Sequence, residues 1–316
     1  MATMNNPIVA IQCLVYNHEP YLRDCLGGFV SQQTNFPFVA IVHDDASKDN
    51  SAAIIREFAE KYPDIIIPIY ETENQYRKPN GALMNIMNTA IDKTGCKYIA
   101  ICEGDDYWTD PFKLQKQVDI LEANKELMAC VTNTCMVDNK GNLLEAQKEN
   151  VVQGNQEGVY DIYDFFKVPQ HQYPTATVIY RAKHLDEIRR KFRHTENAFL
   201  GDWTLWIIIH SYGAFYYLDE VTAAYRINPT SLTHTVNRVA RAKASTRICN
   251  RLADTLEDRY PDLAKMLRKT RWTWVPLMFA YKAEKRYFPM FGCFIVACFA
   301  CPDSLYGVIK KKLTRK

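Results

Sequence analysis

Short apolar runs and amphipathic helical stretches alternate through the first 124 residues of the chain. The apolar runs occupy residues 7–16, 38–45, 65–70 and 97–102, and the helical stretches occupy residues 20–33, 51–62, 80–93 and 111–124. The runs do not alternate strictly between apolar and polar residues, which is typical of strands buried on both faces of a parallel sheet. This order predicts an α/β fold, a doubly wound and mainly parallel sheet with helices on both faces.

The rhythm changes after residue 127. Residues 128–137 and 174–181 have strand composition, residues 201–213 have helical spacing, and residues 214–218 and 222–227 are expected to form two short strands. A strongly basic helix is predicted over residues 237–259. With no internal repeat and no low-complexity linker, we expect one domain over residues 1–235 and a helical, basic extension over residues 236–316.

Composition excludes several classes of protein. Of the 316 residues, 47% are hydrophobic and 24% are charged, which is a normal globular balance. The net charge of +3 is too small to suggest nucleic-acid binding. The start, MATMNNP, lacks the basic and apolar regions of a signal peptide, and scattered cysteines inside apolar runs are typical of a reducing compartment. We therefore expect a cytoplasmic protein.

The C-terminal segment has the composition of a membrane-surface anchor. Tyr287–Cys301 is uncharged but shorter than the roughly 20 apolar residues of a spanning helix. Two tryptophans flanked by bases precede it, and the basic tail KKKLTRK follows it. This pattern favours peripheral binding to an anionic membrane, on the inner face of the cell membrane. The alternative is a hairpin packed on the core with a solvated basic tail.

Polar side chains gather where three of the predicted strands end. In open α/β sheets, ligands bind outside the carboxyl ends of the strands. The residues concerned are Tyr16, Asn17 and Glu19 after the first strand, Asp44 and Asp45 after the second, and Glu103, Asp105 and Asp106 after the fourth. Helix capping explains single acids here, but not three acids within the stretch CEGDD. Carboxylates in this number favour a hard divalent cation, Mg²⁺ or Mn²⁺, which also binds phosphates.

The sequence lacks the motifs of two common nucleotide sites. No GxxxxGK[ST] loop is present, so a P-loop site is not expected. No GxGxxG follows the first strand, which disfavours a dinucleotide-binding fold.

The motifs together resemble a known family. VAIQCLVYNHEPYLRDCLGGFVSQ, VHDDASKDNS, ENQY and EGDDYWTDPFKLQKQ occur in the order and spacing of family-two inverting glycosyltransferases with the GT-A nucleotide-sugar-binding fold. The resemblance is strong over the first 125 residues and weaker to about residue 234. It implies a nucleotide-sugar half over residues 1–125 and an acceptor half over residues 126–235. The family's metal motif is D-x-D, whereas this chain has E-x-D-D with Glu103 in the first position.

The resemblance also implies roles in donor binding. Tyr16 and Asn17 would border the base, Asp45 would accept a hydrogen bond from it, and Asp44 would support Asp45. Arg77 or Lys78 would approach the diphosphate. The remaining assignments follow the acidic motif: Asp105 would hold the metal with Asp106 as the alternative, and Glu103 would contact the ribose or a metal-bound water.

Transfer with inversion also requires a general base. In the family this aspartate precedes an aromatic-rich helix, and FLGDWTLWI implies Asp202, whose alternative role is to cap that helix. Trp203 and Trp206 are candidates to stack on a sugar face, and their i, i+3 spacing predicts that one of them belongs to the core. Relatives often carry a histidine after the Tyr-Arg pair that can complete the metal site. Here that position is Asn228, and the nearest downstream histidine, His234, is the candidate ligand.

The function implied is the transfer of one sugar from a nucleotide-diphosphate sugar, with UDP as the expected nucleotide. The acceptor would be a hydroxyl of a glycan or lipid-linked glycan, in surface polysaccharide synthesis. The processive relatives carry Q-x-x-R-W and several membrane helices, which are not found here. Two alternatives stay open: a non-catalytic nucleotide-sugar or glycan-binding protein on the same fold, and a sugar nucleotidyltransferase, although VYNHEP lacks the Gly-rich basic loop of that class.

Overall fold

The structure is a computed structural model, and it describes residues 6–78, 81–144, 156–167, 173–194, 201–227 and 238–269. The chain divides into two compact units. The first comprises Met1–Leu185 and Tyr212–Asn228, and the second comprises Asp186–Ser211 and Pro229–Lys316. The division at residue 235 that the sequence suggests stays a prediction. Each unit is described below by itself.

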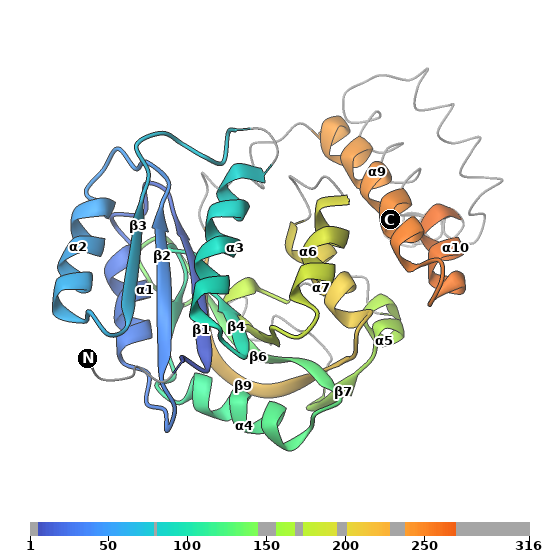
Figure 1. Cartoon of the computed structure of the whole chain (residues 1–316), viewed down its shortest axis with the longest axis horizontal. Coiled ribbons are helices and arrows are strands. Elements are labelled where there is room, and N and C mark those ends of the chain that lie inside the picture. Colours follow the sequence, from blue (N-terminus) through green and yellow to red (C-terminus); the bar gives the residue numbers. More distant parts are fainter. Residues whose placement is uncertain are drawn as a thin grey trace, which may run out of the picture. The chain divides into compact units, whose positions relative to one another are not determined.

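A single mixed sheet forms the centre of the first unit (Figure 1). Its strands are β1 (Val9–Val15), β2 (Phe38–Asp44), β3 (Ile66–Tyr70), β4 (Tyr98–Ile101), β5 (Tyr107–Trp108), β6 (Leu127–Val137), β7 (Gly158–Tyr160), β8 (Val178–Arg181) and β9 (Ala214–Arg226). Their order is β3-β2-β1-β4-β8-β6-β9-β5, with β7 paired to β9. The first four strands in this order are parallel, as predicted. Beyond them β8 runs antiparallel to both β4 and β6.

Helices flank the sheet, which confirms the predicted fold class. In the first unit they are α1 (Leu22–Val30), α2 (Ser51–Lys61), α3 (Ala82–Thr94), α4 (Lys113–Ala123), α5 (Ile162–Lys167) and the short 3₁₀ helix η3 (Thr175–Thr177). Strand order moves one way from β1 to β3 and reverses toward β4, so right-handed crossovers place α1 and α2 on one face and α3 on the other. The contacts agree, since α1 touches α2, while α3 touches β1 and β2.

Burial explains why these stretches fold as they do. Every residue of β2 is buried, and β1 is buried except at Leu14, so both strands need apolar side chains on both faces. Helix α1 buries Leu22, Cys25, Leu26 and Phe29, which have the i, i+3, i+4, i+7 spacing of one helix face. One hydrophobic core joins β1 to this face and to the buried faces of α2 and α4.

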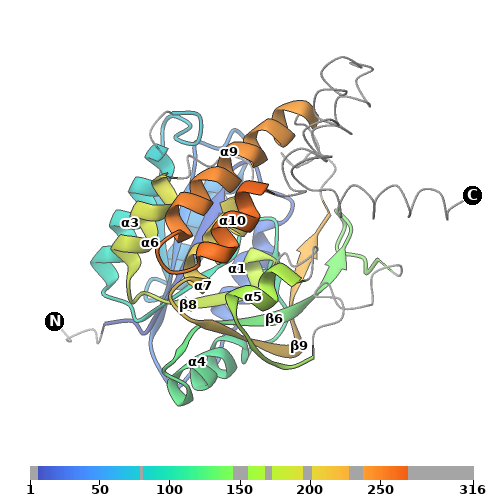
Figure 2. The ribbon, with the colours of Figure 1, turned by 90° about the vertical axis from the view of Figure 1, so that its right-hand side faces the viewer.

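The second half of the sheet differs from prediction at one place. Residues 214–218 and 222–227 were expected as two short strands, but β9 is continuous from Ala214 to Arg226. Figure 2 shows β9 beside β6, and the register between them shifts around Asn133, which pairs with Val221 while Thr132 pairs with Leu218. A β-bulge of this kind accommodates the exposed Asp219 and Glu220 without ending the strand.

The described helices of the second unit are α6 (Leu185–His194, which begins at the last residue of the first unit), α7 (Gly201–His210), α9 (Arg238–Leu256) and α10 (Pro261–Lys269). The predicted basic helix corresponds to α9, with slightly shorter bounds. Among the described residues, no helix combines the length and the apolar character needed to cross a membrane. The predicted anchor, Tyr287–Lys316, lies outside the described residues.

Candidate active site

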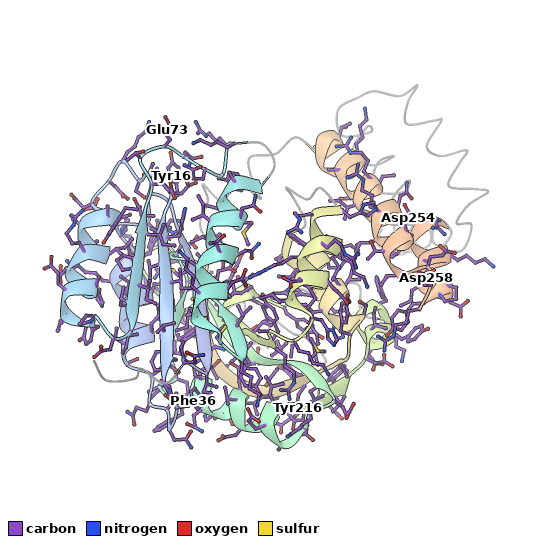
Figure 3. All side chains as sticks on the ribbon, in the orientation of Figure 1. Tyr16, Phe36, Glu73, Tyr216, Asp254 and Asp258 are labelled. Atoms are coloured by element: carbon purple, nitrogen blue, oxygen red, sulfur yellow. The ribbon has the colours of Figure 1, made fainter. Side chains whose placement is uncertain are left out.

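The loops that follow β2 and β4 meet at the end of β1, which lies between these strands. The Asp45 N–H donates to the Val15 carbonyl at 2.9 Å, and the Gly104 N–H donates to the Leu14 carbonyl at 3.0 Å. Figure 3 shows Tyr16 at this end of the parallel strands and Phe36, which precedes β2, at the other. The polar groups predicted from three separate stretches are therefore brought to one edge of the sheet.

Asn17 and Glu19 brace the loop that follows β2. Asn17 adopts a left-handed backbone (φ 56°), its N–H donates to Ser47 Oγ at 2.9 Å, and its Oδ1 accepts the Lys48 N–H at 2.7 Å. Both carboxylate oxygens of Glu19 accept from Asn50, the backbone N–H at 3.0 Å and the side-chain amide at 2.6 Å. These contacts give both residues a positioning role, and their contact with a donor stays a prediction.

Asp45 holds the loop that follows β3. Its two carboxylate oxygens accept the backbone N–H groups of Gln75, at 2.5 Å, and of Tyr76, at 3.0 Å. The residue is buried, and Asn74 Nδ2 donates to its carbonyl at 3.2 Å. A carboxylate has about four acceptor positions, so capacity for a further donor remains.

Asp44 lies beneath this contact. Its Oδ2 accepts the Ser47 N–H at 3.3 Å, while its buried Oδ1 has no hydrogen-bond partner among the described residues. Its backbone carbonyl accepts the Glu71 N–H at 3.0 Å. Asp44 therefore helps to shape both the β2 and the β3 loops, which suits the supporting role predicted for it.

The basic candidates occupy the outer part of the β3 loop. Arg77 has an exposed side chain, and its N–H donates to Asn74 Oδ1 at 3.1 Å. Lys78 forms an exposed ion pair with Glu73 at 2.9 Å. Of the two cations predicted to approach a diphosphate, Lys78 is therefore paired with an acid, and Arg77 is the stronger candidate.

The three acids of the motif after β4 differ in their partners. The Glu103 carboxylate accepts a hydrogen bond from the hydroxyl of Thr175, in η3. Asp106 is 3% exposed and accepts the Arg226 N–H at 2.8 Å. Burial, and then the neighbouring charge of Asp105, raise the pKa of Asp106 well above its ordinary value. Asp105 is half-buried, and its carboxylate makes no hydrogen bond or ion pair to any residue that the structure describes.

Gly104 allows the motif to pack against the first strand. A Cβ built on this glycine would lie 2.8 Å from His18 Nδ1 and 3.0 Å from Val15 Cγ2. Both distances are shorter than ordinary van der Waals contacts, so a side chain at this position would force its neighbours to move. The glycine between Glu103 and Asp105 is therefore explained by close packing.

Arg226 anchors the same motif from β9, a role that was not predicted from the sequence. Its guanidinium donates to the Asp105 carbonyl at 2.9 Å and to the Asp138 carbonyl at 3.2 Å, and it pairs with Asp24 at 3.2 Å. It also lies over the ring of Tyr21, 4.6 Å from the centroid. The pairing of β9 with β5 and with β6 brings it here, and no local pattern around YRI indicates that pairing.

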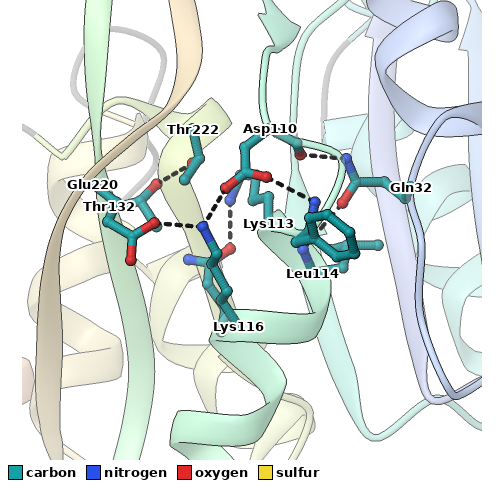
Figure 4. Close-up of polar contacts among 10 residues, drawn as sticks. Gln32, Asp110, Lys113, Leu114, Lys116, Thr132, Glu220 and Thr222 are labelled. Atoms are coloured by element: carbon teal, nitrogen blue, oxygen red, sulfur yellow. Dashed lines mark hydrogen bonds and ion pairs between the residues drawn. The ribbon is translucent and has the colours of Figure 1, made fainter.

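Asp110 and Pro111 lie just before α4, whose N-cap residue is Phe112. Asp110 Oδ1 accepts the Phe112 N–H at 2.8 Å, and the Asp110 carbonyl accepts from Gln32 Nε2 at 2.8 Å. Figure 4 shows Lys116 between Asp110 and Glu220, paired to both. Asp110 is therefore engaged at the start of the helix.

The donor set suits a cation that takes few ligands from the protein. Among the described residues, no three His, Cys, Asp or Glu side chains come together as a complete metal cage. Mg²⁺ is commonly held by one or two carboxylates and completes its shell with phosphate and water oxygens. Asp105 fits this arrangement, and the burial and backbone contact of Asp106 make it the weaker candidate. His234 lies outside the described residues.

The predicted base belongs to the second unit. Asp202 and Trp203 lie in the first turn of α7, and Asp202 Oδ1 accepts the Trp203 N–H at 2.8 Å. Although much of the Asp202 residue is exposed, the surrounding protein reduces hydration of the carboxylate and raises its pKa, an effect that the hydrogen bond from Trp203 opposes.

Comparison with protein families gives one match that covers most of the first unit. The sequence model of the family described as glycosyl transferase family 2 matches residues 13–215. An uncharacterized glycosyltransferase of Methanocaldococcus jannaschii is 27% identical over 229 residues, which cover 71% of this chain and 72% of that protein. An uncharacterized protein of Mycobacterium tuberculosis is 42% identical over 122 residues, 39% of this chain. The match spans about a third, 34%, of that mycobacterial protein.

Two solved structures share the fold. TarS 1–349 of S. aureus in complex with UDP has a TM-score of 0.58 at 14% identity, over 83% of this chain and 69% of that chain. The mannosyltransferase PcManGT of Pyrobaculum calidifontis, in complex with GDP-Man and Mn²⁺, has a TM-score of 0.51 at 17% identity, over 99% of this chain and 82% of that chain. At these identities the likeness establishes the fold alone.

Proposed function

Because the chain belongs to glycosyl transferase family 2, we propose that it transfers one sugar, with inversion, from a nucleoside-diphosphate sugar to a hydroxyl of a glycan or lipid-linked glycan. UDP is the nucleotide we propose first, and surface polysaccharide synthesis is the proposed setting. The observation that carries the proposal is the partner-free carboxylate of Asp105, among the described residues, at the sheet edge where the β2 and β4 loops meet.

Donor binding in this proposal uses the loops already described. Asp45 fixes the backbone of residues 75 and 76 and faces the base, while Tyr16 borders it. Asp105 would hold Mn²⁺ or Mg²⁺, with His234 as a further candidate. When bound, the cation would offset the negative charge of the departing diphosphate. Arg77 would approach the same diphosphate, and Glu103 would contact the ribose or a metal-bound water.

Asp202 is the proposed general base. It would accept the proton of the acceptor hydroxyl, and Trp203 would stack on a sugar ring. A base must be ionised, so lowering the pH toward the raised pKa of Asp202 removes activity. We expect the acid limb of kcat to lie above the usual range for an aspartate.

Two substitutions test these assignments separately. Asp202→Asn is expected to retain Mn²⁺-dependent UDP binding and to lose sugar transfer by a factor of roughly 10² or more, the contribution typical of general acid–base catalysis. Asp105→Asn is expected to weaken metal-dependent nucleotide binding itself. Isothermal titration with UDP and Mn²⁺, alongside release of UDP from a panel of UDP-sugars, measures both. Full turnover by Asp202→Asn refutes the base assignment, and binding without transfer by the unmodified chain favours a non-catalytic binding protein.

Attachment to an anionic membrane surface is proposed for Tyr287–Lys316. Its support is composition: an uncharged apolar stretch followed by a basic tail. The test is sedimentation with phosphatidylglycerol liposomes. Deleting the segment is expected to leave the protein in the supernatant, and equal sedimentation with and without it overturns the anchor.

A further inference from the structure

The short helix η3, a single turn of chain, contacts the acidic motif after β4, residues 103–106, through a hydroxyl group. Thr175 begins this turn, and its Oγ1 donates to Glu103 Oε2. Both residues are half-buried. A hydroxyl that donates to an ionised carboxylate forms a charge-assisted bond, which is stronger than a neutral one. The turn lies 72 residues after Glu103 in the sequence, and its contact with β4 brings the two together.

Buried donors fix the turn from the side of the core. The Ala176 carbonyl accepts from Trp108 Nε1 at 2.9 Å. The Thr177 carbonyl accepts from Gln117 Nε2 at 2.9 Å and from Lys113 Nζ at 3.3 Å. Lys113 and Gln117 are completely buried on α4, whose start is shown in Figure 4. Successive carbonyls of the turn are thus held by side chains with little freedom to move.

This anchoring gives the Thr175 hydroxyl a defined position. A glutamate side chain loses roughly 1.5–2 kcal/mol of rotamer freedom when it is fixed, more than most side chains. A carboxylate next to two other acids is also pushed away by their charges. The Thr175 hydroxyl, which the core holds in place, offsets the lost rotamer freedom and the repulsion by the neighbouring acids. Glu103 is therefore oriented before any ligand binds.

We propose that Thr175 is a positioning residue of the donor site, which fixes the Glu103 carboxylate in the orientation that the metal–nucleotide complex requires. The inference rests on the proposed function, since it assigns a purpose to Glu103 within that site. Thr175 acts through Glu103 and touches no reacting atom in this scheme. The buried contacts of Lys113, Gln117 and Trp108 serve to hold the turn.

The test compares matched hydroxyl deletions. Thr175→Val removes the hydroxyl and preserves the shape of the side chain, while Thr175→Ser keeps the hydroxyl. Thr134→Val is the control, because it deletes another hydroxyl of the same unit, one that donates to the Ala223 carbonyl at 2.7 Å. Each protein is titrated with UDP and with GDP in the presence of Mn²⁺, and its melting temperature is measured.

Thr175→Val is expected to bind the metal-dependent nucleotide roughly 10-fold more weakly, the scale of one hydrogen bond to a charged group. Thr175→Ser and Thr134→Val are expected to stay within about 3-fold of the unmodified protein. In a Glu103→Gln background, Thr175→Val should add little, because the two substitutions remove the same interaction.

Three outcomes overturn the proposal: unchanged affinity in Thr175→Val, an equal loss in Thr134→Val, or a full additional loss in the Glu103→Gln background. Failure of Thr175→Val and Thr175→Ala to fold also overturns it, because Thr175 is then a structural residue. Asp105→Asn distinguishes failure of the Thr175 proposal from failure of the proposed donor site. If it leaves metal-dependent binding intact, or if the unmodified chain binds neither nucleotide, the proposed donor site itself is wrong.

Discussion

Two adjacent glycines of α1 provide a sharp test of the packing around the acidic motif. A Cβ at Gly28 would lie 2.9 Å from both the backbone N and the backbone O of Trp108, whereas a Cβ at Gly27 would meet nothing within 4 Å. Backbone atoms of a paired strand cannot move aside as a flexible side chain can. Alanine at these two neighbouring positions should therefore change stability in opposite directions.

The expected difference follows from two terms. Replacing a helical glycine with alanine stabilises by up to about 1 kcal/mol, and this gain applies to both variants. Overpacking costs about 1–3 kcal/mol, and contact with main-chain atoms favours the upper end for Gly28→Ala. Gly27→Ala is thus expected to be about 1 kcal/mol more stable than the unmodified protein, and Gly28→Ala about 2 kcal/mol less stable. A gap of about 3 kcal/mol corresponds to roughly 6–12 °C in melting temperature.

Urea unfolding followed by tryptophan fluorescence, with calorimetry on the same samples, measures this gap. Trp108 also donates to Ala176 in η3, so Gly28→Ala should additionally weaken nucleotide binding through the turn. Unfolding of the two variants at the same urea concentration would contradict this packing around Trp108, and so would a greater stability of Gly28→Ala.

Three further predictions concern buried contacts of the first unit. Gly104→Ala should destabilise by about 1–3 kcal/mol in urea unfolding, because its Cβ overlaps His18 and Val15, and an unchanged midpoint contradicts this packing. Arg226→Lys should cost about 2 kcal/mol, because an ammonium group cannot reproduce the guanidinium contacts, and a loss below about 0.5 kcal/mol refutes this anchoring role. Lys113 has its pKa lowered by burial to about 7, so the folded state binds fewer protons than the unfolded state between that pH and about 10.5. Stability should consequently rise with pH in this window, by at most about 1.4 kcal/mol per pH unit, and Lys113→Met should flatten that slope; equal slopes contradict the assignment.

Local patterns predicted the parallel part of the fold well. β1 and β2 are buried on both faces, so their sequences are mostly apolar, with Gln12, His43 and Asp44 as buried polar exceptions, and α1 carries an apolar stripe. Elements that bury few residues were not predicted. Helix α6 is one example: it is ten residues long, and Ile188 is its one fully buried residue in the described structure. β5 is another, because its two residues form a strand only by pairing with β9.

Local patterns also predicted only part of the candidate site. Sequence patterns predicted which strand ends carry polar groups, and the structure brings the β1, β2 and β4 loops together. The partners of the individual acids depend on contacts across 72 residues for Glu103 and 120 residues for Asp106. No local spacing encodes such contacts. The resemblance favoured Asp105 as the metal ligand, but no pattern in the sequence indicated that Thr175 binds Glu103 or that the Arg226 backbone binds Asp106.

The hydrogen bonds between Asp45 and the loop after β3 have a consequence for the evolution and redesign of this chain. Asp45 binds the loop through main-chain N–H groups, which almost any amino acid supplies. The side chains of Tyr76 and Arg77, both exposed, do not provide that anchor. Substitutions at these two positions are therefore expected to leave the loop in place. If the proposed donor site is right, a library confined to residues 76 and 77 changes the choice of nucleotide without unfolding the chain.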